Sequence, residues 1–171
     1  MNIIEEIDTS ISEKLANEKL KQSVLITLFS YIGSVFSILV FLIILFFCFK
    51  EKSFVIESIC SLAYATGIVF VLKFTVKRQR NTSNIDKFRQ KVDPYSFPSG
   101  HISRIFAAIS PFYSLLYVSI TTSILGSLAA FARISKGYHY LSDCIVGTII
   151  GVASSFLAKM TLKFLSTLIF Q

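Results

Sequence analysis

The chain consists of long apolar runs separated by short polar segments, and the lengths of these runs predict helices that cross a membrane. The first run, residues 24–49, has no charged residue. As a helix it would be about 39 Å long, enough to cross a bilayer with some tilt. Four more spans are expected at about 53–72, 102–117, 118–131 and 144–170. A short polar turn around Thr121 is expected to join the third span to the fourth.

The composition favours a membrane protein over a soluble domain. Hydrophobic residues make up 53% of the 171 residues, Phe occurs 17 times, and the mean hydropathy is +0.67. These values are too apolar for an ordinary soluble domain. We therefore expect an all-α fold: a polytopic membrane helix bundle of about five transmembrane helices, formed by residues 23–171 as a single domain.

Residues 1–22 differ from the rest because acids, lysines and aliphatic residues alternate there. The aliphatic positions near helical spacing are Ile3, Ile4, Ile7, Ile11, Leu15 and Leu20. This pattern predicts an N-terminal amphipathic helix that lies on the membrane surface. A solvated tail is the alternative interpretation.

The net charge of +7 is concentrated between residues 73 and 93. The basic residues there are Lys73, Lys77, Arg78, Arg80, Lys87, Arg89 and Lys91, against the acids Asp86 and Asp93. Such a loop can mark the cytoplasmic side or meet anionic lipids. However, Lys73, Lys77 and Arg80 would share one face if the helix continued, and a bound phosphate would relieve their repulsion. Nucleic acid is a poor alternative, because so hydrophobic a chain leaves little surface to bind it.

The segment Pro98-Ser99-Gly100-His101 lies where a polar loop meets an apolar run. Ser99 is a good helix N-cap, and Gly100 lets a ligand approach the backbone amides. Free amides and the helix dipole favour an anion at this position, with His101 at its edge. The alternative is a structural histidine at the start of a helix.

His139 and Asp143 are four residues apart, so on a helix they share a face. The carboxylate could then bind one ring nitrogen and leave the other as a nucleophile or base. A simple capping pair is the alternative. Arg133, six residues before the histidine, offers another planar donor to phosphate. Zinc is disfavoured because two histidines and one nearby aspartate are the whole supply of ligands, so no metal or other cofactor is expected.

With these residues the chain resembles the type 2 phosphatidic-acid phosphatase (PAP2) superfamily of integral membrane lipid phosphatases. That superfamily carries Lys-x6-Arg-Pro, Pro-Ser-Gly-His and Ser-Arg-x5-His-x3-Asp, in this order. The matching residues are Lys73 and Arg80, then residues 98–101, then Arg133, His139 and Asp143. The resemblance places catalytic loops at 73–101 and 132–143. Asn81 replaces the usual Pro and Ala132 the usual Ser, changes expected to reduce activity or shift substrate preference.

The resemblance implies metal-independent phosphoryl transfer through a phosphohistidine. His139 would attack phosphorus with Asp143 orienting the ring, while His101 would protonate the leaving oxygen and later help to activate water. The phosphate oxygens would be held by Lys73, Arg80, Ser99, the Gly100 amide and Arg133.

The substrate implied by the resemblance is a membrane lipid that carries its phosphate at the bilayer surface. The bacterial candidates are phosphorylated lipid A, undecaprenyl pyrophosphate and phosphatidylglycerol phosphate. The small size suggests the cytoplasmic (inner) membrane of a bacterium, with the site on the periplasmic side and no obligatory protein partner. The candidates for contacts to a second phosphate, or to another anionic group of the lipid headgroup, are Lys77, Arg78 and Arg104. Alternatively, Arg104 only pairs with a carboxylate such as Asp143 or Glu57.

Two other functions remain open at this point. A lipid phosphotransferase would pass the phosphate to another acceptor through the same motifs. A non-catalytic binder or transporter of lipid phosphates would need the cations but not the pair of His139 and Asp143. The related vanadium-dependent haloperoxidases are soluble, and the apolar spans argue against that activity.

Overall fold

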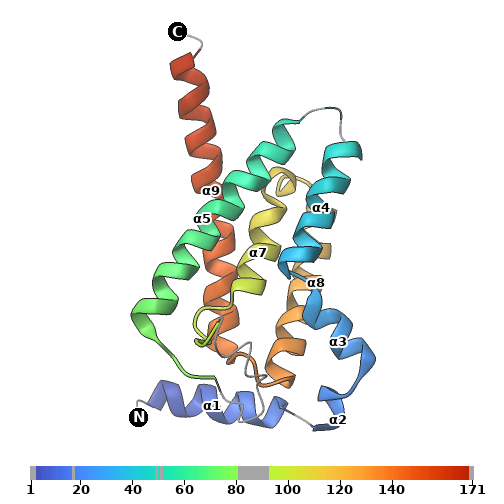
Figure 1. The fold of residues 1–171 in the computed structure, drawn as a ribbon, viewed down its shortest axis with the longest axis vertical. Coiled ribbons are helices and arrows are strands. Elements are labelled where there is room, and N and C mark those ends of the chain that lie inside the picture. The colour runs from blue at the N-terminus through green and yellow to red at the C-terminus, as the bar shows by residue number, and fades with distance from the viewer. Residues whose placement is uncertain (1–2, 17, 49, 51, 81–92, 170–171) are drawn as a thin grey trace.

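The computed structural model describes residues 3–16, 18–48, 50, 52–80 and 93–169. The helices in this part of the chain are α1 (Ile3–Leu15), α2 (Glu18–Lys21), α3 (Val24–Tyr31), α4 (Val35–Cys48), α5 (Ser53–Val76), α7 (Gly100–Ala108), the 3-10 turn η1 (Ser110–Phe112), α8 (Leu116–Ser135) and α9 (Leu141–Ile169). Figure 1 shows α4, α5, α7, α8 and α9 running roughly along the long axis, with α1 lying across one end. The expected all-α membrane fold is confirmed.

The first apolar run is broken, so the prediction of one continuous helix over 24–49 is wrong. Helices α3 and α4 meet at an angle of 63°. Between them Gly33 has φ +79°, which favours glycine, and a Cβ at this position would collide with the His101 carbonyl oxygen. Glycine at this position therefore allows both the turn of the backbone and the close contact with α7.

The boundaries expected for the third and fourth spans are also wrong. Helix α7 has nine residues, and the chain turns through η1, where Pro111 lies in the first turn. Helix α8 then continues through Thr121, the residue at which the turn was expected. The Thr121 hydroxyl donates a 2.8 Å hydrogen bond to the Tyr117 carbonyl one turn earlier, so this polar residue fits inside an apolar helix.

The expected number of five spans is not confirmed over the described residues. Helices α5, α8 and α9 are long and apolar enough to cross a membrane, and the bent pair of α3 and α4 would make a fourth span. Helix α7, at about 13 Å, is too short to cross a bilayer alone. Instead it lies inside the bundle and presents its first turn to the region where the motifs meet.

Small residues allow α7 to pack closely against α9. A Cβ on Gly147 would lie 2.6 Å from the Ser99 carbonyl oxygen, and one on Gly151 would lie 2.5 Å from that of Ser103. On the other side Ala65 and Val69 of α5 join the same buried cluster as Ala107. Close backbone approach through small residues is typical of helix packing in membranes.

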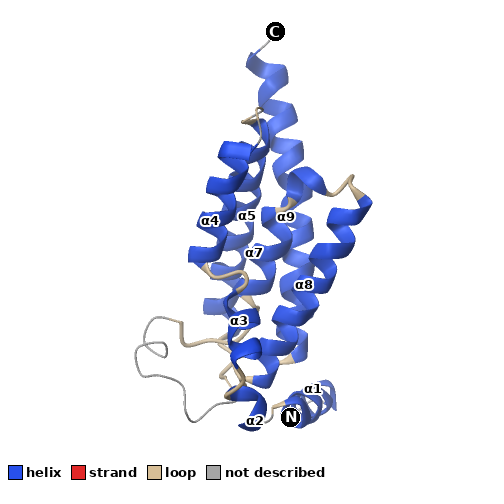
Figure 2. Ribbon diagram, turned by 90° about the vertical axis from the view of Figure 1, so that its right-hand side faces the viewer, coloured by secondary structure: helices blue, strands red, loops and turns tan. Residues whose placement is uncertain are grey.

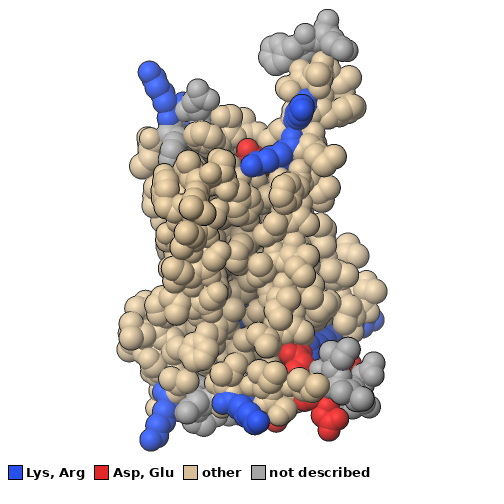
Figure 3. Space-filling view, turned by 180° about the vertical axis from the view of Figure 1, so that it is seen from behind, with Lys and Arg blue, Asp and Glu red and all other residues tan. Residues whose placement is uncertain are grey.

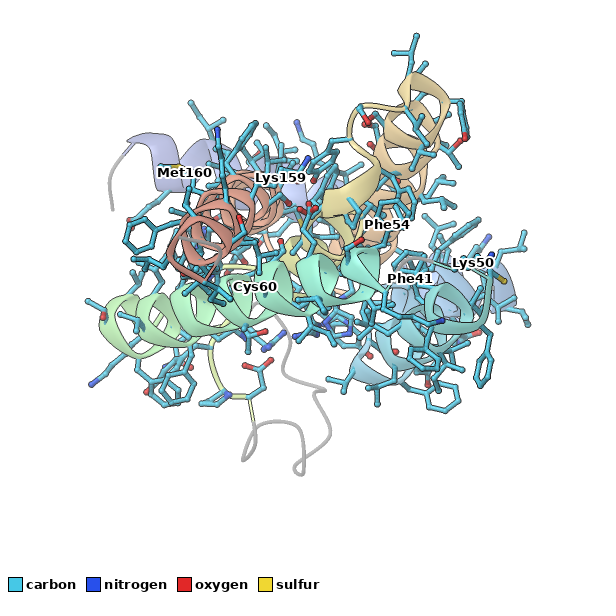
Figure 4. The ribbon with its side chains drawn as sticks, turned by 90° about the horizontal axis from the view of Figure 1, so that it is seen from above. Phe41, Lys50, Phe54, Cys60, Lys159 and Met160 are labelled. Carbon is cyan, nitrogen blue, oxygen red and sulfur yellow. The ribbon has the colours of Figure 1, made fainter. Side chains whose placement is uncertain are left out.

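The surface fits a bilayer around the bundle. Figure 3 shows an uncharged middle with Lys, Arg, Asp and Glu gathered toward the two ends. At the end shown in Figure 4, Lys159 of α9 lies 3.8 Å from the carboxylate of Glu57, which also accepts a 2.6 Å hydrogen bond from Ser110. The cations and the cavity described below lie at the opposite end, beside α1.

The N-terminal segment 1–22, expected as one amphipathic helix, contains α1 and the short α2. Figures 1 and 2 show α1 beside the end of the bundle where α8 ends and α9 begins. Its polar residues Asp8 and Ser12 are buried against the bundle, whereas Ile7 and Ile11 are 55% and 38% exposed. Helix α1 therefore docks on the protein through a polar edge and leaves apolar side chains free to meet lipid.

Candidate active site

Residues of all three predicted motifs line a cavity of about 220 Å³ at the end of the bundle nearest α1. The other predicted motif residues, Arg80, Ser99, Arg133 and Asp143, are not among the residues that line it. Its charged and imidazole lining comes from Lys73, Asp93, His101, Arg104 and His139, with Gly100 at the N-terminus of α7. Figure 1 shows why these distant segments meet: α5 and α8 end, and α7 and α9 begin, toward the same end of the molecule.

Arg133 lies between the two histidines. Its Nη1 is 3.3 Å from Nε2 of His101, and its Nη2 is 3.3 Å from Nε2 of His139. Arg133 and His139 are each 3% exposed. Both rings therefore present Nε2 to one buried cation, which is the arrangement expected if they flank a single phosphate.

The other nitrogen of His139 faces a residue that the motifs did not identify. Its Nδ1 is 2.8 Å from the carbonyl oxygen of Ser96 and 3.5 Å from Oδ2 of Asp143. In the tautomer that fits, Nδ1–H donates to the Ser96 carbonyl and the lone pair lies on Nε2. Every residue has a backbone carbonyl, so the sequence could not indicate that Ser96 would bind His139.

The environment of His139 favours the neutral ring. Burial, followed by the positive charges of Arg133, Arg80 and Lys73, places the pKa of His139 well below its usual value. A neutral imidazole with a lone pair on Nε2 is the form that can act as a nucleophile. The cations around His139 thus also favour its unprotonated ring.

Asp143 both caps helix α9 and faces the ring of His139, the two roles that its spacing from His139 suggested. It is fully buried, and its Oδ2 accepts a 2.9 Å hydrogen bond from the Tyr140 amide just before α9. The same oxygen lies 3.5 Å from His139 Nδ1, and Oδ1 accepts a 3.0 Å bond from Arg78. The carboxylate is therefore a helix cap that also faces the ring.

Lys73 and Arg80 converge on Asp93, which the motifs did not mark as a site residue. Arg80 Nη2 donates a 2.7 Å hydrogen bond to Oδ2 of Asp93, and Lys73 is bonded to Oδ1. Burial alone would raise the pKa of Asp93, but Lys73 and Arg80 more than offset this and lower it. One carboxylate of the protein therefore pairs with both cations of the first motif and offsets one of their two positive charges.

The expectation that Lys73, Lys77 and Arg80 share a helical face is wrong. Helix α5 ends at Val76 because Lys77 adopts a left-handed conformation with φ 52°. Arg80 instead reaches Asp93 from the following loop, where its Nη1 also donates a 2.8 Å hydrogen bond to the Tyr138 carbonyl.

The remaining predicted residues divide between the cavity and its surroundings. Arg104 lines the cavity: its Nε donates a 2.9 Å hydrogen bond to the Gly33 carbonyl, and its Nη2 lies 3.4 Å from His101 Nδ1. Among the described contacts, Arg104 thus binds the Gly33 carbonyl and His101, and not the carboxylates of Asp143 or Glu57. Lys77 and Arg78 are not part of the cavity lining, and their headgroup contacts stay a prediction.

Ser99 occupies the expected N-cap position of α7, but its side chain makes no capping hydrogen bond. The residue is fully buried against α9, and its amide donates a 2.9 Å hydrogen bond to the Asp143 carbonyl. Contact between its hydroxyl and phosphate stays a prediction. Gly100, the next residue, does line the cavity.

Membrane helices around a cationic cavity with two imidazoles are the features of an integral membrane phosphatase. Comparison with known proteins identifies the family: the model of the PAP2 superfamily matches residues 54–165, and the chain belongs to this superfamily. The matched region begins in α5 and includes all three motifs, so α1 to α4 precede it.

Individual proteins agree with this assignment. The chain is 26% identical to "Probable lipid phosphate phosphatase beta" of Arabidopsis thaliana over 144 residues, which cover 66% of this chain and 68% of the plant protein. The fold is similar to the crystal structure of Aquifex aeolicus LpxE, with a TM-score of 0.71, 23% identity, and coverage of 91% of this chain and 93% of that one. It is also similar to the first transmembrane PAP2 type phosphatidylglycerolphosphate phosphatase from Bacillus subtilis, with a TM-score of 0.75, 20% identity, and coverage of 95% and 88%.

Proposed function

We propose that the protein is a metal-independent lipid phosphatase that transfers the phosphate of a lipid headgroup first to His139 and then to water. The observation that carries this proposal is the position of Arg133 between Nε2 of His101 and Nε2 of His139. A phosphate that binds this guanidinium would have a nucleophile on one side and a proton donor on the other.

In the first step, Nε2 of His139 attacks phosphorus and the bond to the lipid oxygen breaks. His101 gives its proton to that oxygen. Positive charge on the His139 ring is stabilised by the hydrogen bond from Nδ1 to the Ser96 carbonyl and by Asp143 nearby. In the second step, water replaces His139 on phosphorus, and the proton that it loses returns to His101.

The charge of the transferring phosphoryl group is met by protein cations. Lys73, Arg80 and Arg133 are the basic side chains of the three motifs, and the Gly100 amide lies at the start of α7. They would supply the electrostatic stabilisation that a metal ion provides in other phosphoryl-transfer sites. For a phosphate to bind Lys73 and Arg80, the carboxylate of Asp93 must give up part of its contact with them.

A lipid substrate is supported by the place of the cavity, which lies at one end of a bundle with an apolar belt. Such a position lets the phosphate enter while the tails stay in the bilayer. We infer a bacterial inner-membrane enzyme with its site on the periplasmic side, acting on lipid A phosphate, undecaprenyl pyrophosphate or phosphatidylglycerol phosphate.

Arg104 would distinguish among these lipids. It lines the cavity beside His101 and belongs to none of the three motifs, so it is placed for a second phosphate or another anionic group. Arg104→Ala should then lower turnover of diphosphorylated lipids more than that of monophosphorylated lipids. Equal losses on both would contradict this part of the proposal.

The proposed function is tested by phosphate release from these three lipid classes with purified protein and excess chelator. Wild-type protein should release inorganic phosphate, and His139→Ala should not. A requirement for added metal, or activity that survives His139→Ala, would contradict the mechanism. Transfer of the phosphate to a lipid or sugar hydroxyl without its release would identify a phosphotransferase.

A further inference from the structure

Asp8 and Asp143 hold the same guanidinium from two sides, although 135 positions separate them in the chain. Arg78 donates from Nη2 to Oδ2 of Asp8 at 2.7 Å and from Nη1 to Oδ1 of Asp143 at 3.0 Å. The guanidinium also stacks on the ring of Tyr140, with 3.8 Å between its central carbon and the ring centroid. A residue of the N-terminal helix is thereby linked to the carboxylate that faces His139.

A second set of contacts ties α1 to the start of α9. Oδ1 of Asp8 accepts a 3.0 Å hydrogen bond from the Ser142 amide, and Oδ2 accepts one of 2.6 Å from the Ser142 hydroxyl. The Ser12 hydroxyl oxygen accepts a 3.1 Å bond from the Leu141 amide. The first amides of a helix have no partner within the helix, and here a different helix supplies the acceptors. Asp143 follows directly in the same turn.

Both contact residues of α1 are shielded from water. Asp8 is 9% exposed and Ser12 is 2% exposed. Burial alone would raise the pKa of Asp8, but hydrogen bonds from Ser142 and Arg78 more than offset this and lower it. Asp8 is therefore a carboxylate at neutral pH, and Arg78 carries a positive charge shared between two anions.

We propose that Asp8 is a positioning residue of the reaction, which sets the place of Asp143 beside His139 through Arg78 and Ser142. Helix α1 is then a working part of the active site, although it precedes the region that matches the PAP2 superfamily. This inference rests on the proposed function. Asp8 is absent from the cavity lining, so its loss should lower kcat and leave KM nearly unchanged.

The physical reason is competition for Arg78. Without the charge of Asp8, the guanidinium moves fully onto Asp143 and draws this carboxylate away from His139 Nδ1, from which it is separated by 3.5 Å. The ring then loses part of the negative charge that stabilises its positive form in the transition state. The expected loss is about tenfold in kcat, the rate equivalent of one charge-assisted hydrogen bond.

The first experiment compares Asp8→Asn with Glu6→Gln in full-length purified protein. Glu6 is an exposed acid on the same helix, so both variants remove one negative charge from α1. We expect Asp8→Asn to lower kcat about tenfold with KM within about twofold, and Glu6→Gln to match wild type. Unchanged kcat in Asp8→Asn, or an equal loss in Glu6→Gln, would overturn the proposal.

The second experiment separates positioning from simple docking of α1. Ser12→Ala removes a contact between α1 and α9 that does not involve Arg78. We expect it to lower the unfolding temperature with little change in kcat per folded molecule. A loss of kcat as large as that of Asp8→Asn would overturn the proposal, because docking alone would then explain the effect.

The third experiment combines Asp8→Asn with Asp143→Asn. If Asp8 acts through Asp143, adding Asp8→Asn to Asp143→Asn changes kcat by less than about twofold. Losses that multiply would overturn the proposal. Full activity in Asp143→Asn would contradict the role that the proposed mechanism gives to Asp143. An inactive Asp143→Asn beside a fully active Asp8→Asn would contradict only the role of Asp8.

Discussion

Arg80 donates a 2.7 Å hydrogen bond to Asp93, so a cation of the first motif is already paired with a carboxylate inside the protein. Asp93 is bonded to Lys73 in the same way. The side chain of Asp93 is 41% exposed, whereas that of Arg80 is 2% exposed. The carboxylate therefore lies nearer to the solvent than the guanidinium that it binds. Any incoming phosphate must compete with it.

This competition predicts tighter binding of anions when the charge of Asp93 is removed. Asp93→Asn keeps an acceptor for Arg80 but lowers the attraction that the anion must overcome. We expect the inhibition constant of inorganic phosphate or orthovanadate to fall about threefold, a modest value because the carboxylate is partly exposed. Glu6→Gln serves as the matched loss of an exposed charge outside the cavity lining. Weaker inhibition in Asp93→Asn would show that Asp93 supports anion binding instead.

The low pKa of His139 predicts activity in acid. In the proposed mechanism His139 attacks as the neutral ring, and its pKa in the folded protein lies well below the usual value. As the pH falls through about 6.5, the ordinary histidine value, His139 stays neutral, so kcat/KM should not yet fall on its account. The acidic limb should appear at lower pH. A profile of kcat/KM against pH with its acidic midpoint at or above about 6.5 is the contrary result.

Gly33 predicts a sharp difference between two glycine substitutions. Gly33 has φ +79° and lies against the His101 carbonyl, whereas a Cβ on Gly67 would meet no atom within 4 Å. Gly33→Ala should destabilise the protein by about 1–3 kcal/mol and lower kcat by displacing His101. Gly67→Ala should leave both unchanged or raise stability slightly. Thermal unfolding and turnover of the two variants check this, and equal behaviour would mean that the turn at Gly33 does not set His101.

The convergence of the site could be predicted because its chemistry depends on residue types at short spacing. His139 and Asp143 are four residues apart, so their side chains meet at the start of α9 although His139 precedes this helix and the two do not share a helical face. The matches to the three motifs place Lys73, His101 and Arg133 at the ends of apolar runs. The contacts of Ser96 and Asp93 could not be predicted. The first uses a backbone carbonyl, and the second joins Lys73 to a residue 20 positions later in the chain.

The helix boundaries were missed for a related reason. The pair Gly33-Ser34 is a local signal for a break that the length of the apolar run obscured, and the contact of Gly33 with α7 could not be seen from the sequence. Thr121 suggested a turn because it is polar, but its hydroxyl is satisfied by the preceding helical turn. Local pattern determines that a run is helical, whereas tertiary contacts determine where it bends.

The polar contacts of α1 show the same limit. The spacing of Ile7 and Ile11 indicated an amphipathic helix, and both residues are exposed as a membrane-surface helix requires. The pattern gave no reason to connect Asp8 with Arg78, since the partner of a lone acid among several is not written in local sequence. Only the folded chain brings the two together.

The most direct measurement is trapping of the phosphorylated enzyme during turnover of a lipid labelled with 32P, in the presence of chelator. The account predicts a label that is stable in base and labile in acid, as a phosphohistidine is, located on His139 and absent from His139→Ala. Rapid turnover without a trapped label in any quench, or a label that persists in His139→Ala, would contradict the central claim that this imidazole attacks phosphorus.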